Sequence, residues 1–111
     1  MGGAHDKMVK ITQKLIEESA RNFRDNNPLH YGEDAIACGM LPLSMVISKV
    51  AGDNPNHVLT YLHTWFRKPI NIGDDIKVAY INDDGHIHAN ITNQKREVVV
   101  EIVGRIMLWK K

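Results

Sequence analysis

The chain has 111 residues, of which 43% are hydrophobic, so it is long enough for one domain with a buried core. Its formal net charge of +1 argues against a basic nucleic-acid-binding surface. The sequence contains no run of about 18 apolar residues, so a transmembrane helix is not expected. Residues 1–8 lack the apolar stretch of a signal peptide and are expected to be a flexible N-terminus, with residues 9–111 as a single domain. A single cysteine, Cys38, excludes an internal disulfide and fits a reducing cytoplasm.

Two helices are expected in the first half of the chain. Residues 10–23 place apolar side chains on one side, with Thr12 as the N-cap. Glu17 and Glu18 stand early in this segment and Arg21 late, which suits the helix dipole. Residues 39–52 form the second expected helix, and because they are apolar almost all round we expect that helix to be buried.

Strands are expected in the second half, over residues 57–66, 76–81, 86–92 and 97–109. The last strand is apolar on both faces for much of its length, which predicts a central position. Gly104 within it predicts a bulge or the close approach of another backbone. An antiparallel sheet of this size can curl around one apolar helix, so the predicted class is α+β, with the hot-dog arrangement. Pairing of two such units into a dimer would cover the remaining sheet edge.

The stretch "DNNPLH" places Asp25 and His30 five residues apart, with a proline that prevents the helix from continuing. A short rigid turn would bring the carboxylate and the imidazole to the same side of the loop. Such a pair could hold a water, take a proton from it and give a proton elsewhere. The alternative interpretation is that Asp25 only caps a turn and that His30 is a surface residue, which is common at this spacing.

Gly39 opens the apolar helix nine residues later, in "CGML". Without a side chain it would let a ligand carbonyl approach its backbone N–H, at the positive end of the helix dipole. This is the geometry of an oxyanion hole. On local grounds, tight packing at the start of the helix explains this glycine equally well.

These two stretches together resemble the MaoC-like or (R)-specific enoyl-CoA hydratase family. That family's motif reads Asp, any residue, Asn-Pro, an apolar residue and His, and residues 25–30 match it throughout. "WFRKPINIGDDIKV", at residues 65–78, is similar to the family's strand, proline and Gly-Asp turn. The resemblance extends over roughly residues 9–109.

The resemblance implies a homodimeric hot-dog enzyme, a hydro-lyase that hydrates trans-2-enoyl thioesters to (R)-3-hydroxyacyl thioesters or runs the reverse dehydration. Asp25 and His30 would activate the water, and the Gly39 amide would polarise the thioester carbonyl. Substrate-binding positions would include Asn27, Cys38 and Met40. No metal and no separate cofactor is implied, because coenzyme A or the phosphopantetheine of an acyl carrier protein is part of the substrate. Nucleic acid is not an expected partner.

The chain departs from the family pattern at two places. Cys38 stands where the family usually has a histidine before the "GM" pair. The segment after the motif histidine, "YGEDAIAC", is shorter than in the family and lacks room for a small helix over the site. We expect this shortening to open the pocket to a longer or carrier-bound acyl group.

Other interpretations of the same residues stay open. Cys38 could act as a nucleophile with His30, although a lone cysteine beside an apolar helix is more often a small core residue. His86 and His88 alternate on one strand face and could reach one metal, but no third ligand has suitable spacing. The chain as a whole could also be a hot-dog thioesterase, or a non-catalytic module that binds acyl thioesters.

Overall fold

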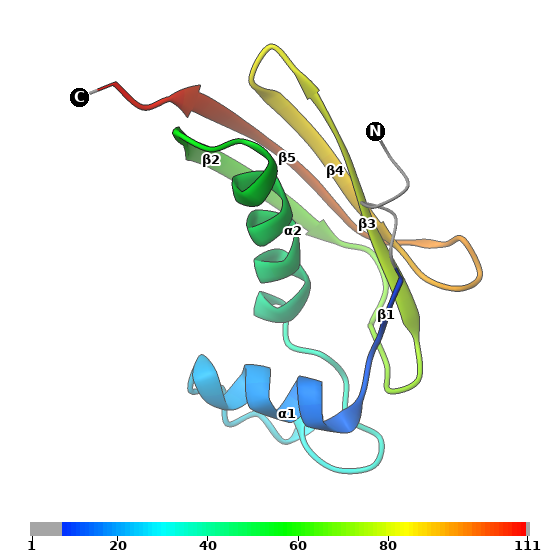
Figure 1. Ribbon diagram of the computed structural model, residues 1–111. Coiled ribbons are helices and arrows are strands. Elements are labelled where there is room, and N and C mark those ends of the chain that lie inside the picture. Colours follow the sequence, from blue (N-terminus) through cyan, green and yellow to red (C-terminus); the bar gives the residue numbers. More distant parts are fainter. Residues whose placement is uncertain (1–7, 111) are drawn as a thin grey trace.

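The computed structural model describes residues 8–110, which fold into one antiparallel sheet of five strands with two α-helices (Figure 1). In chain order the elements are β1 (Met8–Lys10), α1 (Gln13–Asn22), the 3₁₀ helix η2 (Pro28–His30), α2 (Met40–Asp53), β2 (His57–Phe66), β3 (Asp75–Asp83), β4 (His86–Thr92) and β5 (Val98–Leu108).

The sheet has the strand order β1-β3-β4-β5-β2, and α2 lies along one of its faces (Figure 1). Helix α1 lies beyond the N-terminal end of α2, at the end of the molecule where the loops gather (Figure 1). The core lies between the sheet and the helices. Its largest fully buried side chains are Ile11, Ile16, Val46, Ile76, Ile91, Val99, Val100 and Ile102.

The predicted helices are confirmed, with one difference in burial. The Thr12 hydroxyl accepts a hydrogen bond from the Leu15 N–H at 3.1 Å, so Thr12 is the N-cap of α1. Helix α2 is buried along one side only, the side that faces the sheet. Its buried residues are Leu41, Pro42, Val46 and Val50, whereas Leu43, Met45 and Ile47 are only partly buried.

The predicted strands are confirmed as well. Strand β5 has β4 on one side and β2 on the other, which confirms its position inside the sheet. The prediction for Gly104 is also confirmed, because a Cβ at this residue would lie 2.6 Å from the backbone oxygen of Tyr61. The accompanying bulge lies in the partner strand, where the β2–β5 register shifts between Leu59 and Tyr61.

Strand β1 is absent from the sequence-based prediction. It consists of Met8–Lys10 and pairs antiparallel with β3, so Met8 belongs to the sheet and not to a flexible N-terminus. Three residues are too few for the alternation of apolar and polar side chains to be recognised. Residues 1–7 of the expected flexible segment lie outside the described residues. Among residues 8–110, no helix is long and apolar enough to cross a membrane.

Candidate active site

The loop that carries Asp25 and His30 is shaped by its own polar side chains. Arg24, just after the C-cap of α1, has a positive φ of 55°, and the Asp25 N–H donates to the Ala20 carbonyl at 2.8 Å. The Asp25 Oδ1 accepts from the Asn27 N–H at 3.0 Å, and the Asn27 Oδ1 accepts from the Leu29 N–H at 3.0 Å. These two successive side-chain-to-backbone turns form a rigid link between the aspartate and the 3₁₀ helix.

Asp25 and His30 meet as the sequence predicts. The Asp25 Oδ2 lies 3.1 Å from the His30 Nε2, and the His30 Nδ1–H donates to the Ile36 carbonyl at 2.7 Å. The exposed fractions of the two side chains are 37% for Asp25 and 13% for His30. The carboxylate is therefore reachable from solvent, whereas the imidazole is largely covered and held at both nitrogens.

This geometry defines what the pair can do with a proton. The Ile36 carbonyl can only accept, so Nδ1 carries a hydrogen, and the 3.1 Å contact between Nε2 and the Asp25 carboxylate is a hydrogen bond when Nε2 also carries one. When Nε2 carries no hydrogen, it and the Asp25 Oδ2 are both acceptors, and a water beside them could donate one hydrogen to each. The pair is thus suited to binding a water and accepting its proton.

Gly39 is the N-cap residue of α2 and lines a pocket of about 410 Å³. The ring of Phe66, from β2, packs directly on this glycine, since a Cβ there would lie 2.8 Å from the Phe66 Cζ. Neither Asp25 nor His30 belongs to the wall of this pocket. A short stretch of backbone links the Asp25–His30 pair to this pocket. The Ile36 carbonyl accepts a hydrogen bond from His30, and the next residue, Ala37, lines the pocket.

The three predicted substrate-binding residues differ in their surroundings. Asn27 is exposed, but its side-chain oxygen is engaged in capping the 3₁₀ helix. Met40 is exposed in the first turn of α2. Cys38 is only 3% exposed, and its Sγ lies 3.6 Å from the Ser19 hydroxyl. The placement of Cys38 matches the interpretation as a small core residue, since its thiol contacts Ser19 while the His30 nitrogens contact Ile36 and Asp25.

His86 and His88 lie on the outer face of the sheet, far along the chain from this loop. The His86 Nε2 accepts from the Arg105 guanidinium at 2.9 Å, and the His88 Nε2 lies 3.5 Å from the Glu101 carboxylate. Each histidine thus has its own partner on β5. Within residues 8–110, no three His, Cys, Asp or Glu side chains are grouped so that they could hold a metal ion.

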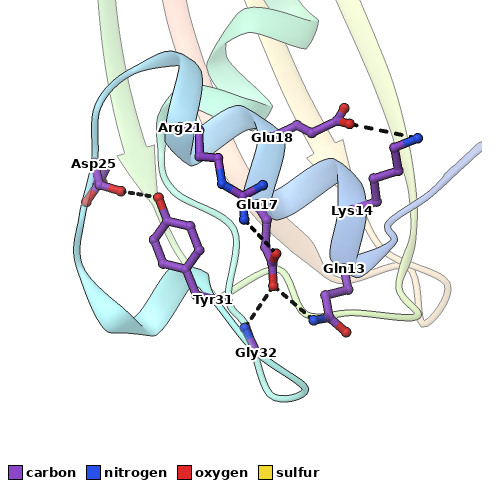
Figure 2. A network of polar contacts seen from close by, with 8 residues as sticks. All are labelled: Gln13, Lys14, Glu17, Glu18, Arg21, Asp25, Tyr31 and Gly32. Atoms are coloured by element: carbon purple, nitrogen blue, oxygen red, sulfur yellow. Dashed lines mark hydrogen bonds and ion pairs between the residues drawn. The ribbon is translucent and has the colours of Figure 1, made fainter.

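The sequence-based interpretation missed the contacts that hold the Asp25–His30 loop against α1 (Figure 2). The Tyr31 hydroxyl donates to the Asp25 carbonyl at 2.7 Å, and the Glu17 carboxylate accepts from the Gly32 N–H at 2.9 Å. Glu17 lies in the second turn of α1, beyond the first turn where a carboxylate interacts with the helix dipole, and it accepts a hydrogen bond from the loop at Gly32. The hydrogen bond from Gly32, followed by one from Gln13, holds the pKa of the Glu17 carboxyl below its ordinary value of 4.5.

The comparisons with known proteins fall into two groups. No family model and no curated protein sequence matches the chain. Among solved structures, R-hydratase PhaJ1 from Pseudomonas aeruginosa has a TM-score of 0.85 at 21% identity, over 96% of this chain and 79% of that one. The (R)-hydratase from A. caviae has a TM-score of 0.79 at 18% identity, over 91% and 90% of the two chains. The HadBC 3R-hydroxyacyl-ACP dehydratase complex from Mycobacterium tuberculosis has a TM-score of 0.69 at 18% identity, over 90% of each chain.

These similarities define the class of fold. The chain has the hot-dog fold of the (R)-hydratases and MaoC-like dehydratases, as the sequence motifs predict. At these levels of identity the likeness concerns architecture, so the chemistry of this chain has to be argued from its own side chains.

Proposed function

We propose that the protein is a hydro-lyase that hydrates trans-2-enoyl thioesters of coenzyme A or of an acyl carrier protein to (R)-3-hydroxyacyl thioesters, or catalyses the reverse dehydration. The observation that carries this proposal is the 3.1 Å contact between the Asp25 carboxylate and the His30 imidazole. Both are held on a loop whose continuation leads to the Gly39 amide at the head of α2. The single thiol, Cys38, suits a reducing cytoplasm as the compartment.

In the hydration direction, the water oxygen bonds to C3 of the enoyl group while a water proton passes to the Asp25–His30 pair. The electrons of the C2–C3 double bond move toward the thioester oxygen, and a proton returns from the pair to C2. Proton transfer by positioned side chains contributes about 10²- to 10⁴-fold. The Gly39 N–H would stabilise the charge on the thioester oxygen, and a donor in that role is worth about 3–4 kcal/mol.

We further propose that the active protein is a homodimer that pairs through β2. This strand forms one edge of the sheet and exposes large apolar side chains. The opposite edge, β1, has only three residues and offers little to a partner. The exposed apolar residues of β2 are Val58, Leu59, Tyr61, Trp65 and Phe66. Light scattering coupled to size exclusion is expected to give twice the mass of one chain, and a monomer mass would contradict the dimer.

The hydration of crotonyl-CoA tests the proposed activity. The wild-type protein is expected to form 3-hydroxybutyryl-CoA, and Asp25→Asn and His30→Ala are each expected to lose at least about 10²-fold in kcat/KM. A parallel assay for free thiol separates this activity from a thioesterase. Release of coenzyme A without formation of the hydroxyacyl product would overturn the proposal in favour of the thioesterase.

A non-catalytic acyl-thioester-binding module is the second candidate. The observation that favours it is the packing of Phe66 on Gly39, which covers the residue that should receive the thioester carbonyl. Calorimetry with crotonyl-CoA distinguishes the two functions. Binding without turnover, unchanged in Asp25→Asn, would support the module and contradict the enzyme.

A further inference from the structure

Both ends of the loop that carries Asp25 and His30 are attached to α1. At the first end, the Asp25 N–H donates to the Ala20 carbonyl at 2.8 Å. At the second end, the Gly32 N–H donates to the Glu17 carboxylate at 2.9 Å. Glu17 and Ala20 are three residues apart and so lie next to each other on one side of the helix. The eight residues 25–32 thus leave α1 and return to it within about one helical turn.

Tyr31 connects the two ends. Its hydroxyl donates to the Asp25 carbonyl at 2.7 Å, across the mouth of the loop (Figure 2). The guanidinium of Arg21 lies 5.5 Å from the centre of the Tyr31 ring and also 3.2 Å from the Glu17 carboxylate. Arg21 therefore links the tyrosine at one end with the carboxylate at the other.

We propose that Tyr31 and Glu17 are positioning residues, which fix the separation of the Asp25 carboxylate and the His30 imidazole by holding both ends of their loop on α1. This inference rests on the proposed hydratase function. Tyr31 directly follows His30 and binds the carbonyl of Asp25, so its hydroxyl sets the backbone distance between the two catalytic residues. Neither residue touches the reacting atoms in this role.

The surroundings of Glu17 support the same role. Its side chain is 17% exposed, whereas that of the adjacent Glu18 is 55% exposed and reaches Lys14 only at 3.9 Å. Gln13, Arg21 and the Gly32 backbone all donate to the Glu17 carboxylate. The Glu17 carboxylate thus has three hydrogen-bond donors, and one of them, the Gly32 N–H, attaches the loop to α1. Gly32 has a φ of +94°, so the loop turns back toward Glu17 at a residue that tolerates this conformation.

The first test is Tyr31→Phe, which removes only the hydroxyl. Because a misplacement of about 1 Å can reduce a rate roughly 10²-fold, we expect kcat for crotonyl-CoA to fall by about 10- to 100-fold with little change in KM. The matched control is Tyr80→Phe, which also deletes a bound hydroxyl, donated to Asp53 at 2.9 Å at the C-terminal end of α2. Equal kcat values in Tyr31→Phe and the wild type would overturn the proposal.

The second test compares Glu17→Ala with Glu17→Gln. Glutamine keeps an acceptor for the Gly32 N–H, so we expect Glu17→Gln to retain most of the kcat that Glu17→Ala loses. Glu18→Ala is the control for removal of a carboxylate from the same helix. If Glu17 only stabilises the fold, Glu17→Ala will have a lower melting temperature, but Glu17→Gln will not retain a higher kcat than Glu17→Ala. That result would contradict the proposal.

Hydrogen exchange of the Gly32 amide separates this proposal from the proposed function. We expect this amide to exchange at least about tenfold faster in Glu17→Ala than in Glu18→Ala, because its acceptor is gone. If wild-type protein does not hydrate crotonyl-CoA, the hydratase function fails, and the exchange rate alone tests whether Glu17 holds the loop. Unchanged exchange in Glu17→Ala would overturn the positioning role whatever the activity.

Discussion

The loop at residues 25–32 and the outer face of the sheet both carry histidines with acidic or basic partners, but they hold them differently. His30 is 13% exposed, with Nε2 on Asp25 and Nδ1 on a backbone carbonyl. On the sheet, His88 is 59% exposed and contacts Glu101 at 3.5 Å, and His86 binds Arg105. A catalytic imidazole needs a fixed ring, and of these three histidines His30 is the one with a polar partner at each ring nitrogen.

The difference lies in what supports each side chain. In residues 25–32, hydrogen bonds from backbone N–H groups to the side chains of Asp25, Asn27 and Glu17 hold the loop in shape. Several hydrogen bonds therefore fix the positions of Asp25 and His30. Strand register places His86 opposite Arg105 and His88 opposite Val103, and each of these exposed side chains has one partner, Arg105 for His86 and Glu101 for His88. A site for acid–base chemistry needs rigid support from a second layer of contacts, and the loop has more of these contacts than the two histidines on the sheet.

Replacement of each histidine in turn is expected to give the largest difference between the loop and the sheet face. His30→Ala is expected to reduce kcat/KM by at least about 10²-fold, because the acid–base group is lost. His86→Ala and His88→Ala are expected to stay within about twofold of wild type, as for ordinary surface substitutions. Steady-state kinetics with crotonyl-CoA measure all three. A loss in His88→Ala as large as that in His30→Ala would place chemistry on the sheet face.

A glycine in each region gives a second contrast, in stability. A Cβ at Gly104 would lie 2.6 Å from the Tyr61 backbone oxygen, which cannot move without disturbing the β2–β5 pairing. We expect Gly104→Ala to cost about 3 kcal/mol, at the upper end of overpacking effects. Gly32 has no atom within 4 Å of such a Cβ, so Gly32→Ala is expected to cost only the backbone strain of its positive φ, about 1–2 kcal/mol. Urea unfolding of the two variants checks the order.

The smallest expected effect is the dependence of the loop's stability on pH, through the Glu17 carboxyl. The pKa of Glu17 is lowered in the folded protein, chiefly by the Gly32 N–H, so its contribution to stability is present above the ordinary value of 4.5 and is lost as the pH falls below it. The exchange of the Gly32 amide, corrected for its intrinsic rate, is expected to accelerate on acidification below 4.5. Glu17→Gln should remove this acid dependence.

Glu101 on the sheet is the control for that experiment. Its pKa is also lowered, first by the Arg67 guanidinium and then by His88. Glu101→Gln is therefore expected to change the acid dependence of global unfolding but to leave that of the Gly32 amide as in the wild type. The same response in both variants would mean that the loop opens only with the whole domain.

Much of this architecture can be predicted from local sequence patterns. The bounds of β2 agree with the apolar run at 57–66, and Thr12 caps α1 as its position suggests. The meeting of Asp25 and His30 is expected from the match of residues 25–30 to the hydratase motif, since their spacing alone leaves the surface interpretation open. Helix α2 is less enclosed than its composition predicts, since Leu43, Met45 and Ile47 are only partly buried in the single chain.

Local patterns in the amino-acid sequence are enough to predict the two α-helices and the four long strands, because these depend on periodicity and caps, and the motif at residues 25–30 is enough to indicate the Asp25–His30 pair. Three features depend on the packing of distant segments: β1 joins the sheet, Phe66 covers Gly39, and Glu17 accepts a hydrogen bond from the Gly32 N–H. Each of these contacts joins residues 15 or more positions apart. Their partners are chosen by the packing of whole elements, which no local pattern of side chains specifies.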